Sequence, residues 1–218
     1  MSRTRLALAD LSALLFDVDG VLLETGAFFE EIWADWARLR GLDPDVVVTR
    51  TRGRRTDDVL RDVAPRLDPA DEHRVLDDLV LGRLGEIRAA EGAAELLAAI
   101  QHGPWAVVTS GTRWFIQQCF AQVGLPFPAV AVCGEDVRHG KPAADGYRAA
   151  SRLLRVEPTA CLVVEDSPAG VTAGKNAGCT VIALATTVPA EQLREADMCF
   201  PDLATAAGPL LAAVRKPR

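Results

Sequence analysis

Two aspartates near the start of the chain, Asp17 and Asp19, stand one residue apart at the end of a short apolar run. The run is typical of a buried strand, and because side chains alternate along a strand, both carboxylates would point to the same side. Gly20 follows and lets the chain turn sharply. Two carboxylates this close repel each other unless a cation or a shared proton relieves them. The segment predicts a hard metal ion, a carboxylate nucleophile or both, although aspartate and glycine are also ordinary turn residues.

Polar residues also follow two later apolar runs. Thr109, Ser110 and Gly111 end one of them, and Lys141 comes shortly after the next. A hydroxyl with backbone N–H groups ahead of a helix can cradle a phosphate; alternatively, Thr112 or Ser110 only caps the helix that follows. A lysine that stands just outside a helix start gains nothing from the helix dipole, so Lys141 needs an anionic neighbour unless it lies exposed in a loop.

A further apolar run ends in two adjacent acids, Glu165 and Asp166, followed by Ser167 and a proline. Mg²⁺ prefers carboxylate and water oxygens, so this pair could bind that ion. The alternative is that Asp166 or Ser167 only caps the helix that the proline begins.

The elements that must position these residues alternate between strands and helices. Apolar runs predict strands, and helical spacing of apolar residues predicts helices. This alternation predicts an α/β fold, a Rossmann-like parallel sheet covered by helices on both faces. In such sheets ligands bind at the carboxyl ends of the strands, where the polar residues above would converge. The predicted strands are 13–16, 105–109, 130–133, 161–165 and 180–184, and the helices between them are 92–100, 113–123, 145–154 and 168–177.

One region interrupts the alternation. Residues 27–90 contain no strong strand pattern, and helices are expected at 28–39, 56–63 and 71–87. We therefore predict a helical cap, residues 25–90, inserted after the first strand of a core made of residues 1–24 and 91–218. Arg54 and Arg55 in this cap could close over an anion, or could lie solvated at a helix start, while Arg50 and Arg52 are expected on the surface.

The composition narrows the function classes. The chain has 218 residues, 49% of them hydrophobic, with a net charge of −6, which argues against nucleic-acid binding but not against an anionic small molecule. The five cysteines form no CxxC pair, which favours a reducing cytoplasm over disulfides or zinc. We expect no signal peptide and no membrane span, and a monomer or weak homodimer.

Together the motifs resemble those of a known family. The series Asp17-x-Asp19-Gly20, Thr-Ser-Gly at 109–111, Gly-Lys-Pro at 140–142 and Glu-Asp-Ser-Pro-Ala-Gly at 165–170 is similar to that of the haloacid dehalogenase-like hydrolases. The resemblance extends from about residue 12 to about residue 203, and the helical insert resembles their small-cap subgroup.

The resemblance implies a role for each motif residue. Asp17 would be the nucleophile that forms an aspartyl-phosphate, and Asp19 the general acid and then base. Thr109, with the Ser110 and Gly111 backbone nearby, would bind the transferring phosphoryl group, and Lys141 would steady Asp17 and the phosphate. Mg²⁺ would be held by Asp17, by Asp19 through its main-chain carbonyl, and by Asp166, with Glu165 beside it.

The resemblance also sorts the activities within the family. Haloacid dehalogenases lack the second aspartate, which is present here as Asp19. β-Phosphoglucomutases carry a histidine near the position of Phe29, whereas no histidine precedes His73 in this chain. The cap segments 52–58 and 63–65 resemble those of glycerol-3-phosphate and 2-deoxyglucose-6-phosphate phosphatases. The expected function is Mg²⁺-dependent hydrolysis of a small sugar or polyol monophosphate, with a mutase-like phosphotransferase or a non-catalytic phosphate-binding protein as alternatives.

Overall fold

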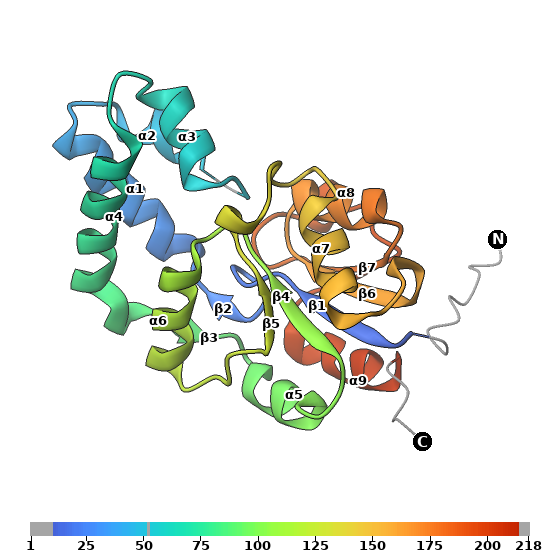
Figure 1. Ribbon diagram of the computed structural model, residues 1–218. Helices are drawn as coiled ribbons and strands as arrows, with labels where there is room; N and C mark the ends of the chain where they lie inside the picture. The colour runs from blue at the N-terminus through green and yellow to red at the C-terminus, as the bar shows by residue number, and fades with distance from the viewer. Residues whose placement is uncertain (1–10, 52, 214–218) are drawn as a thin grey trace.

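The computed structural model describes residues 11–51 and 53–213, which form an α/β structure around one six-stranded sheet (Figure 1). Every pair of neighbouring strands in this sheet is parallel, in the order β5-β4-β1-β6-β7-β8. The predicted fold class is thus confirmed. The strands are β1 (Ala13–Phe16), β4 (Trp105–Val108), β5 (Val130–Val132), β6 (Cys161–Glu165), β7 (Thr180–Leu184) and β8 (Met198–Phe200).

Both faces of the sheet are covered because each strand sends alternate apolar side chains to opposite sides. In β1, Leu14 and Phe16 enter one core, while Ala13 and Leu15 enter the other. The first core is closed by α5 (Ala93–Ile100), α6 (Arg113–Val123) and α9 (Leu203–Ala213). The second is closed by α7 (Asp145–Leu154) and α8 (Pro168–Ala177). With both faces packed, the carboxyl ends of the strands are left as the place where polar groups can gather.

Between β1 and α5 the chain forms a group of helices, called the insert below (Figure 1). Its helix α1 packs against α2 and α4 and buries Ile32, Trp33 and Trp36. Residue 52, for which the sequence predicts a surface position, lies outside the described residues, as do residues 1–10, for which it predicts no signal peptide. The insert contains α1 (Gly26–Leu39), α2 (Pro44–Val48), α3 (Thr56–Val63), α4 (Pro69–Arg83) and the 3₁₀ turn η2 (Leu84–Glu86).

The two chain segments that connect the insert to the core lie side by side. They form a short antiparallel pair, β2 (Leu23–Glu24) with β3 (Arg88–Ala89). Strands of two residues cannot be predicted from the sequence, because so short an element has no measurable periodicity.

Two elements near the carboxyl end of the chain were also not predicted. Strand β8 has three residues at the edge of the sheet, and α9 contains Gly208 and Pro209, which usually interrupt helices. Helix α9 nevertheless buries Leu203, Ala206 and Leu210, so that tertiary packing decides its conformation. Among the described residues, no helix combines the length and apolar character needed to cross a membrane.

Candidate active site

The polar motif residues meet where three neighbouring strands end. Asp17 follows β1, Thr109 follows β4, and Glu165 is the last residue of β6. The sheet pairing extends beyond β1, because the Asp17 amide donates to the Val164 carbonyl at 2.9 Å. Likewise the Thr109 amide donates to the Val132 carbonyl at 3.0 Å. The strand register thus places all three side chains at one edge of the sheet.

Lys141 is the cation of this edge. Its Nζ lies 2.7 Å from Asp17 Oδ1 and 2.5 Å from Glu165 Oε1, and its side chain is only 8% exposed. Burial lowers the pKa of Lys141, but the carboxylates of Asp17 and Glu165 outweigh it and raise the pKa above its ordinary value. The ammonium is therefore charged and fixed between the two acids.

The segment around Lys141 precedes helix α7, as predicted. Helix α7 begins at Asp145, and Lys141 and Pro142 stand in a turn ahead of it. The Lys141–Pro142 peptide bond is cis. Lys141 thus reaches the acids from a loop, and the anionic neighbours expected for it are present.

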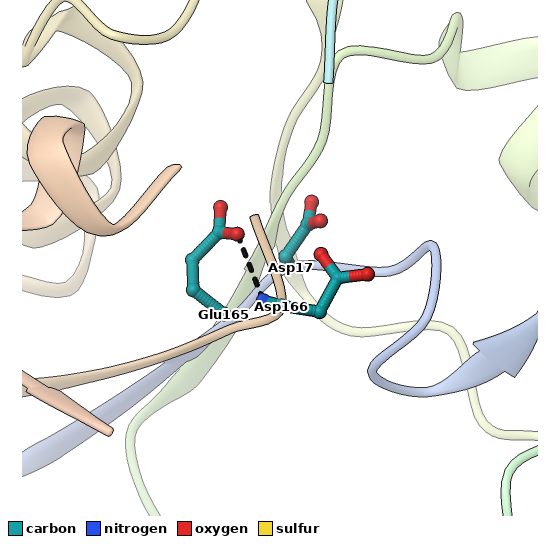
Figure 2. A group of neighbouring side chains, drawn as sticks. All are labelled: Asp17, Glu165 and Asp166. Atoms are coloured by element: carbon teal, nitrogen blue, oxygen red, sulfur yellow. Dashed lines mark hydrogen bonds between the residues drawn. The ribbon is translucent and has the colours of Figure 1, made fainter. Parts of the chain in front are cut away.

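Three carboxylates cluster beside this lysine. One oxygen each of Asp17, Glu165 and Asp166 lies within 4.8 Å of the others, and all three residues are buried (Figure 2). Figure 2 shows Glu165 on one side of Asp17 and Asp166 on the other. Burial, reinforced by Glu165, raises the pKa of Asp166 to about 7, and burial also raises the pKa of Asp17. Carboxylates that crowd one another in this way suit a hard divalent cation.

Two residues, Thr187 and Gly20, lie directly beside the Asp166 carboxylate. The Thr187 hydroxyl donates to Asp166 Oδ2. Gly20 has a positive φ of 72°, and an added Cβ there would lie 2.0 Å from the same oxygen. Only glycine leaves room for the Asp166 carboxylate at this turn, which explains the glycine of the first motif.

Asp19 directly precedes Gly20 in the same turn. Thr25, in the chain segment that enters the insert, donates from its hydroxyl to Asp19 Oδ1 at 2.7 Å. Burial raises the pKa of Asp19, while the hydroxyls of Thr25 and Thr109 and the charge of Lys141 oppose the shift. Asp19 is thus held by hydrogen bonds close to Asp17 without joining the three clustered carboxylates.

The residues after β4 contribute hydroxyl and backbone groups. The Thr109 hydroxyl accepts from the Gly111 amide at 3.0 Å, and the Ser110 hydroxyl donates to the Gly53 carbonyl of the insert at 3.3 Å. Thr109, Ser110, Lys141 and Arg55 all line one small pocket between the core and the insert. Thr112, and not Thr109 or Ser110, caps α6, by accepting from the Phe115 amide.

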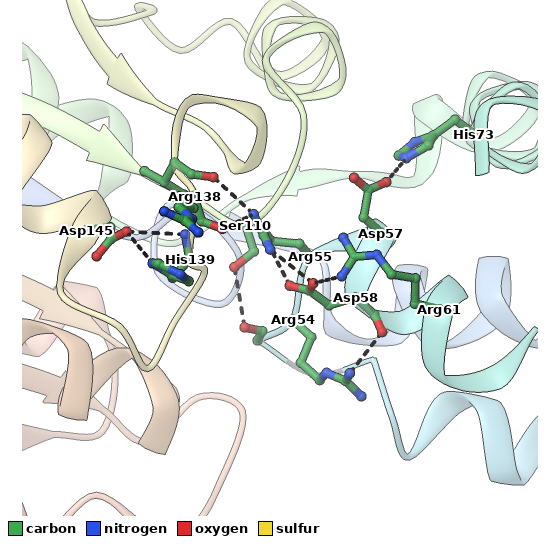
Figure 3. A network of polar contacts seen from close by, with 12 residues as sticks. Arg54, Arg55, Asp57, Asp58, Arg61, His73, Ser110, Arg138, His139 and Asp145 are labelled. Carbon is green, nitrogen blue, oxygen red and sulfur yellow. Dashed lines mark hydrogen bonds and ion pairs between the residues drawn. The ribbon is translucent and has the colours of Figure 1, made fainter. Parts of the chain in front are cut away.

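Arg54 and Arg55, the two arginines of the insert considered as anion ligands, have different surroundings (Figure 3). Arg55 is paired with Asp58 and also donates to the carbonyls of Val137 and Arg138 in the core, at 3.1 and 3.4 Å. Arg54 binds Asp62 and backbone carbonyls within the insert. Arg55 thus reaches the core, while Arg54 binds groups of the insert.

Sequence reasoning missed three residues of the site. Thr25 holds Asp19, Thr187 holds Asp166, and the Tyr147 hydroxyl donates to Glu165 Oε1 at 2.7 Å. None belongs to a motif by spacing. A signal existed for Tyr147 alone, since it is the only tyrosine of the chain and stands on the buried face of a predicted helix.

This fold and this acidic edge define an α/β protein with a parallel sheet, an inserted helical unit and a cluster of carboxylates at the carboxyl ends of the strands. The comparisons agree, since residues 11–178 match the family described as haloacid dehalogenase-like hydrolase. The chain belongs to the haloacid dehalogenase-like hydrolase family, as the motif series predicted.

Named relatives cover most of the chain. It is 37% identical to hexitol phosphatase A of Escherichia coli (strain K12) over 194 residues, 87% of this chain and 90% of the relative. It is 36% identical to validoxylamine A 7'-phosphate phosphatase of Streptomyces hygroscopicus subsp. limoneus, covering 87% of this chain and 92% of the relative. The predicted resemblance to sugar and polyol phosphate phosphatases is confirmed.

A solved structure of a family hydrolase from Deinococcus radiodurans R1 is also similar. It superposes with a TM-score of 0.70 at 28% identity, covering 96% of this chain and 100% of that one. That structure was determined with bound phosphate and sodium.

Proposed function

We propose that the chain hydrolyses a small sugar or polyol monophosphate, with Mg²⁺, through an aspartyl-phosphate on Asp17. The enzyme class is a phosphoric monoester hydrolase, which follows from the family and its phosphatase relatives. One observation carries the finer proposal. The Asp17 carboxylate stands between a buried ammonium, 2.7 Å from its Oδ1, and a second carboxylate, Asp166, able to share a cation with it.

Asp17 and Asp19 divide the covalent chemistry between them. An oxygen of Asp17 attacks phosphorus, and the bond from phosphorus to the alcohol oxygen breaks as the leaving alcohol takes a proton from Asp19. Water, deprotonated by Asp19, then attacks the aspartyl-phosphate, which releases inorganic phosphate and regenerates Asp17. The hydrogen bond from Thr25 holds Asp19 near the reacting oxygens, which supports this division of roles.

The phosphoryl group would be bound by Thr109, the Ser110 and Gly111 backbone, and Lys141. Charge in phosphoryl transfer is spread over the phosphoryl oxygens, so catalysis depends on positioned donors and cations. The Thr109 side chain and the Lys141 ammonium line the same pocket, which supports a shared ligand. The related structure that holds phosphate supports the class of ligand.

The carboxylates fit a divalent ion by their chemistry and their crowding. Asp17 and Asp166 would hold Mg²⁺, with the main-chain carbonyl of Asp19 as a further ligand and Glu165 in the same acidic group. When bound, the ion supplies positive charge that offsets the negative charge of the phosphoryl oxygens.

We propose that the insert determines which phosphate ester is accepted as substrate. We treat residues 25–90 as a cap that moves against a core of residues 1–24 and 91–218, with β2 and β3 as the connection. Arg55 lines the pocket and is the candidate for binding the sugar or polyol part, whereas Arg54, its neighbour in the chain, binds Asp62 and carbonyls of the insert. The names of the relatives support a polyol or sugar phosphate.

A panel of phosphomonoesters tests the proposal. Hexitol phosphates, sugar phosphates, glycerol phosphates and an aryl phosphate are incubated with Mg²⁺ or with EDTA, and free phosphate is measured. We expect phosphate release from polyol or sugar phosphates that stops with EDTA and is lost in Asp17→Asn. A phosphate moved to another carbon without release would indicate a mutase, and binding without turnover a non-catalytic protein; either contradicts the proposal.

A further inference from the structure

The carboxylate of Glu165 is fully buried, and five hydrogen-bond donors surround it. Its Oε1 accepts from the Tyr147 hydroxyl at 2.7 Å and from Lys141 at 2.5 Å. Its Oε2 accepts from the Asp166 amide at 3.0 Å and from the amide and hydroxyl of Ser167 at 3.2 and 3.0 Å. A carboxylate offers about four lone-pair positions, so these donors leave little capacity for a metal ion.

The backbone of α8 packs closely against the same carboxylate. Gly170 lies so near that an added Cβ would fall 1.8 Å from Glu165 Oε1. The carboxylate also lies at the N-terminal end of α8, where the helix dipole favours negative charge. These contacts hold Glu165 against Lys141, and Figure 2 shows Glu165 and Asp166 on opposite sides of Asp17.

Tyr147 completes this arrangement from α7. It is 1% exposed, and the Lys141 ammonium lies 5.7 Å from the centre of its ring. Burial and the nearby carboxylates of Glu165 and Asp17 raise the pKa of Tyr147 well above its usual value, so the hydroxyl keeps its proton and donates. The side chain thus touches both the ammonium and its anchoring carboxylate.

We propose that Tyr147 is a positioning residue for Lys141 that acts through Glu165, and that Glu165 serves the ammonium rather than the metal. The inference rests on the proposed function, because Lys141 must reach the phosphoryl group and Asp17 together. Glu165 Oε1 divides its negative charge between a hydroxyl and an ammonium. Without the hydroxyl, Lys141 is the one strong donor left on that oxygen and is drawn from Asp17 toward Glu165.

Displacement of the Lys141 ammonium should affect kcat and KM differently. The ammonium faces charge that develops in the transition state, so its displacement lowers kcat more than it raises KM. A hydrogen bond to a charged group contributes about 1.5–3 kcal/mol, so losing it corresponds to a fall of roughly 10- to 100-fold. Because Asp166 and Thr187 lie on the other side of Asp17, affinity for the metal should stay unchanged.

The test compares two hydroxyl deletions on opposite sides of Asp17. Tyr147→Phe keeps the ring and removes the donor to Glu165, whereas Thr187→Val removes the donor to Asp166. For each variant we measure kcat and KM at saturating Mg²⁺, Mg²⁺ binding by calorimetry without substrate, and the unfolding temperature as a check of folding. Glu165→Gln, which keeps the shape and removes the charge, and Asp166→Asn are measured in the same way.

We expect Tyr147→Phe to lose about 10- to 100-fold in kcat with KM within about threefold and Mg²⁺ affinity within about twofold of the wild type. Thr187→Val should weaken Mg²⁺ binding, and Glu165→Gln, which removes a nearby charge but no ligand, should weaken it less than Asp166→Asn does. An unchanged kcat in a folded Tyr147→Phe overturns the inference, as does a parallel loss of Mg²⁺ affinity in Tyr147→Phe or a loss in Glu165→Gln as large as that in Asp166→Asn. A wild type that releases no phosphate contradicts the proposed function itself, and with it this inference.

Discussion

The core side and the insert side of the site hold their charges in different ways. In the core, the side chains of Lys141 and Asp17 are 8% and 9% exposed and bonded directly to each other. In the insert, the side chain of Arg54 is 36% exposed and that of Arg55 17%, and both pair with acids of the insert itself. Buried pairs break only at high cost, whereas exposed pairs exchange easily with water or a ligand. This contrast supports the proposal that the core holds the catalytic groups in place and that the insert contacts the variable part of the substrate.

The largest effect should follow from replacing the nucleophile. Asp17→Asn keeps the volume and an oxygen that accepts from Lys141, but it removes the attacking carboxylate. We expect kcat to fall at least about a thousandfold while the unfolding temperature changes by only a few degrees. Steady-state release of phosphate and thermal unfolding check both parts, and a variant that retains near wild-type turnover would remove Asp17 from its role.

The second largest effect concerns the metal. Mg²⁺ at a hundred times its Kd should stabilise the wild type by about 2.7 kcal/mol, a rise of several degrees in unfolding temperature. Asp166→Asn removes a carboxylate of the cluster, so this rise should nearly vanish. Asp35→Asn is the matched control, because Asp35 pairs with Arg38 on the surface of the insert and should keep the full rise. An undiminished rise in Asp166→Asn contradicts the assignment.

On the insert side, the effect should depend on the substrate. Arg55→Ala should lower kcat/KM about tenfold for a hexitol phosphate but less than about threefold for an aryl phosphate, because the polyol loses a charged donor. Arg54 binds groups of the insert, so Arg54→Ala should change either value by less than about threefold. Equal losses on both substrates in Arg55→Ala would remove it from substrate choice.

We expect the smallest effect on turnover from replacing Glu72, a buried acid that, among the described residues, binds only side chains of the insert. Glu72 accepts from the Trp36 indole at 2.7 Å and pairs with Arg40. Glu72→Ala leaves that indole N–H unpaired and should lower the free energy of unfolding by about 1–3 kcal/mol, with kcat within about twofold. Glu72→Gln keeps an acceptor and should lose less. A large fall in kcat would show that the insert does more than select the substrate.

The sequence predicted the strands of the core and the polar residues at their ends better than it predicted the rest of the site. The buried strands were apparent as apolar runs, and the motif residues at their ends converge because parallel strands end at one edge. Asp17, Thr109, Lys141 and Asp166 were therefore assigned from spacing and resemblance before any geometry was known. The family and the resemblance to sugar and polyol phosphate phosphatases are confirmed by the comparisons.

The partners of these residues could not be predicted in the same way. Thr25 lies six residues after Asp19, whereas Tyr147 and Thr187 lie 18 and 21 residues from the acids they bind. Only the packing of α7 and the turn after β7 brings the last two there. The short pair β2–β3 and the proline-containing α9 were missed because tertiary contacts, rather than periodicity, decide them. Long-range packing of this kind leaves no local signal in the chain.

Trapping the covalent intermediate tests the central claim most directly. The enzyme is mixed with a substrate found in the panel, quenched within the first turnovers and reduced with borohydride, which converts an aspartyl-phosphate into homoserine. Peptide mass spectrometry then locates the product. The account predicts homoserine at position 17, dependent on substrate and absent from Asp17→Asn. Turnover with an unmodified Asp17, or with homoserine at another position, would contradict it.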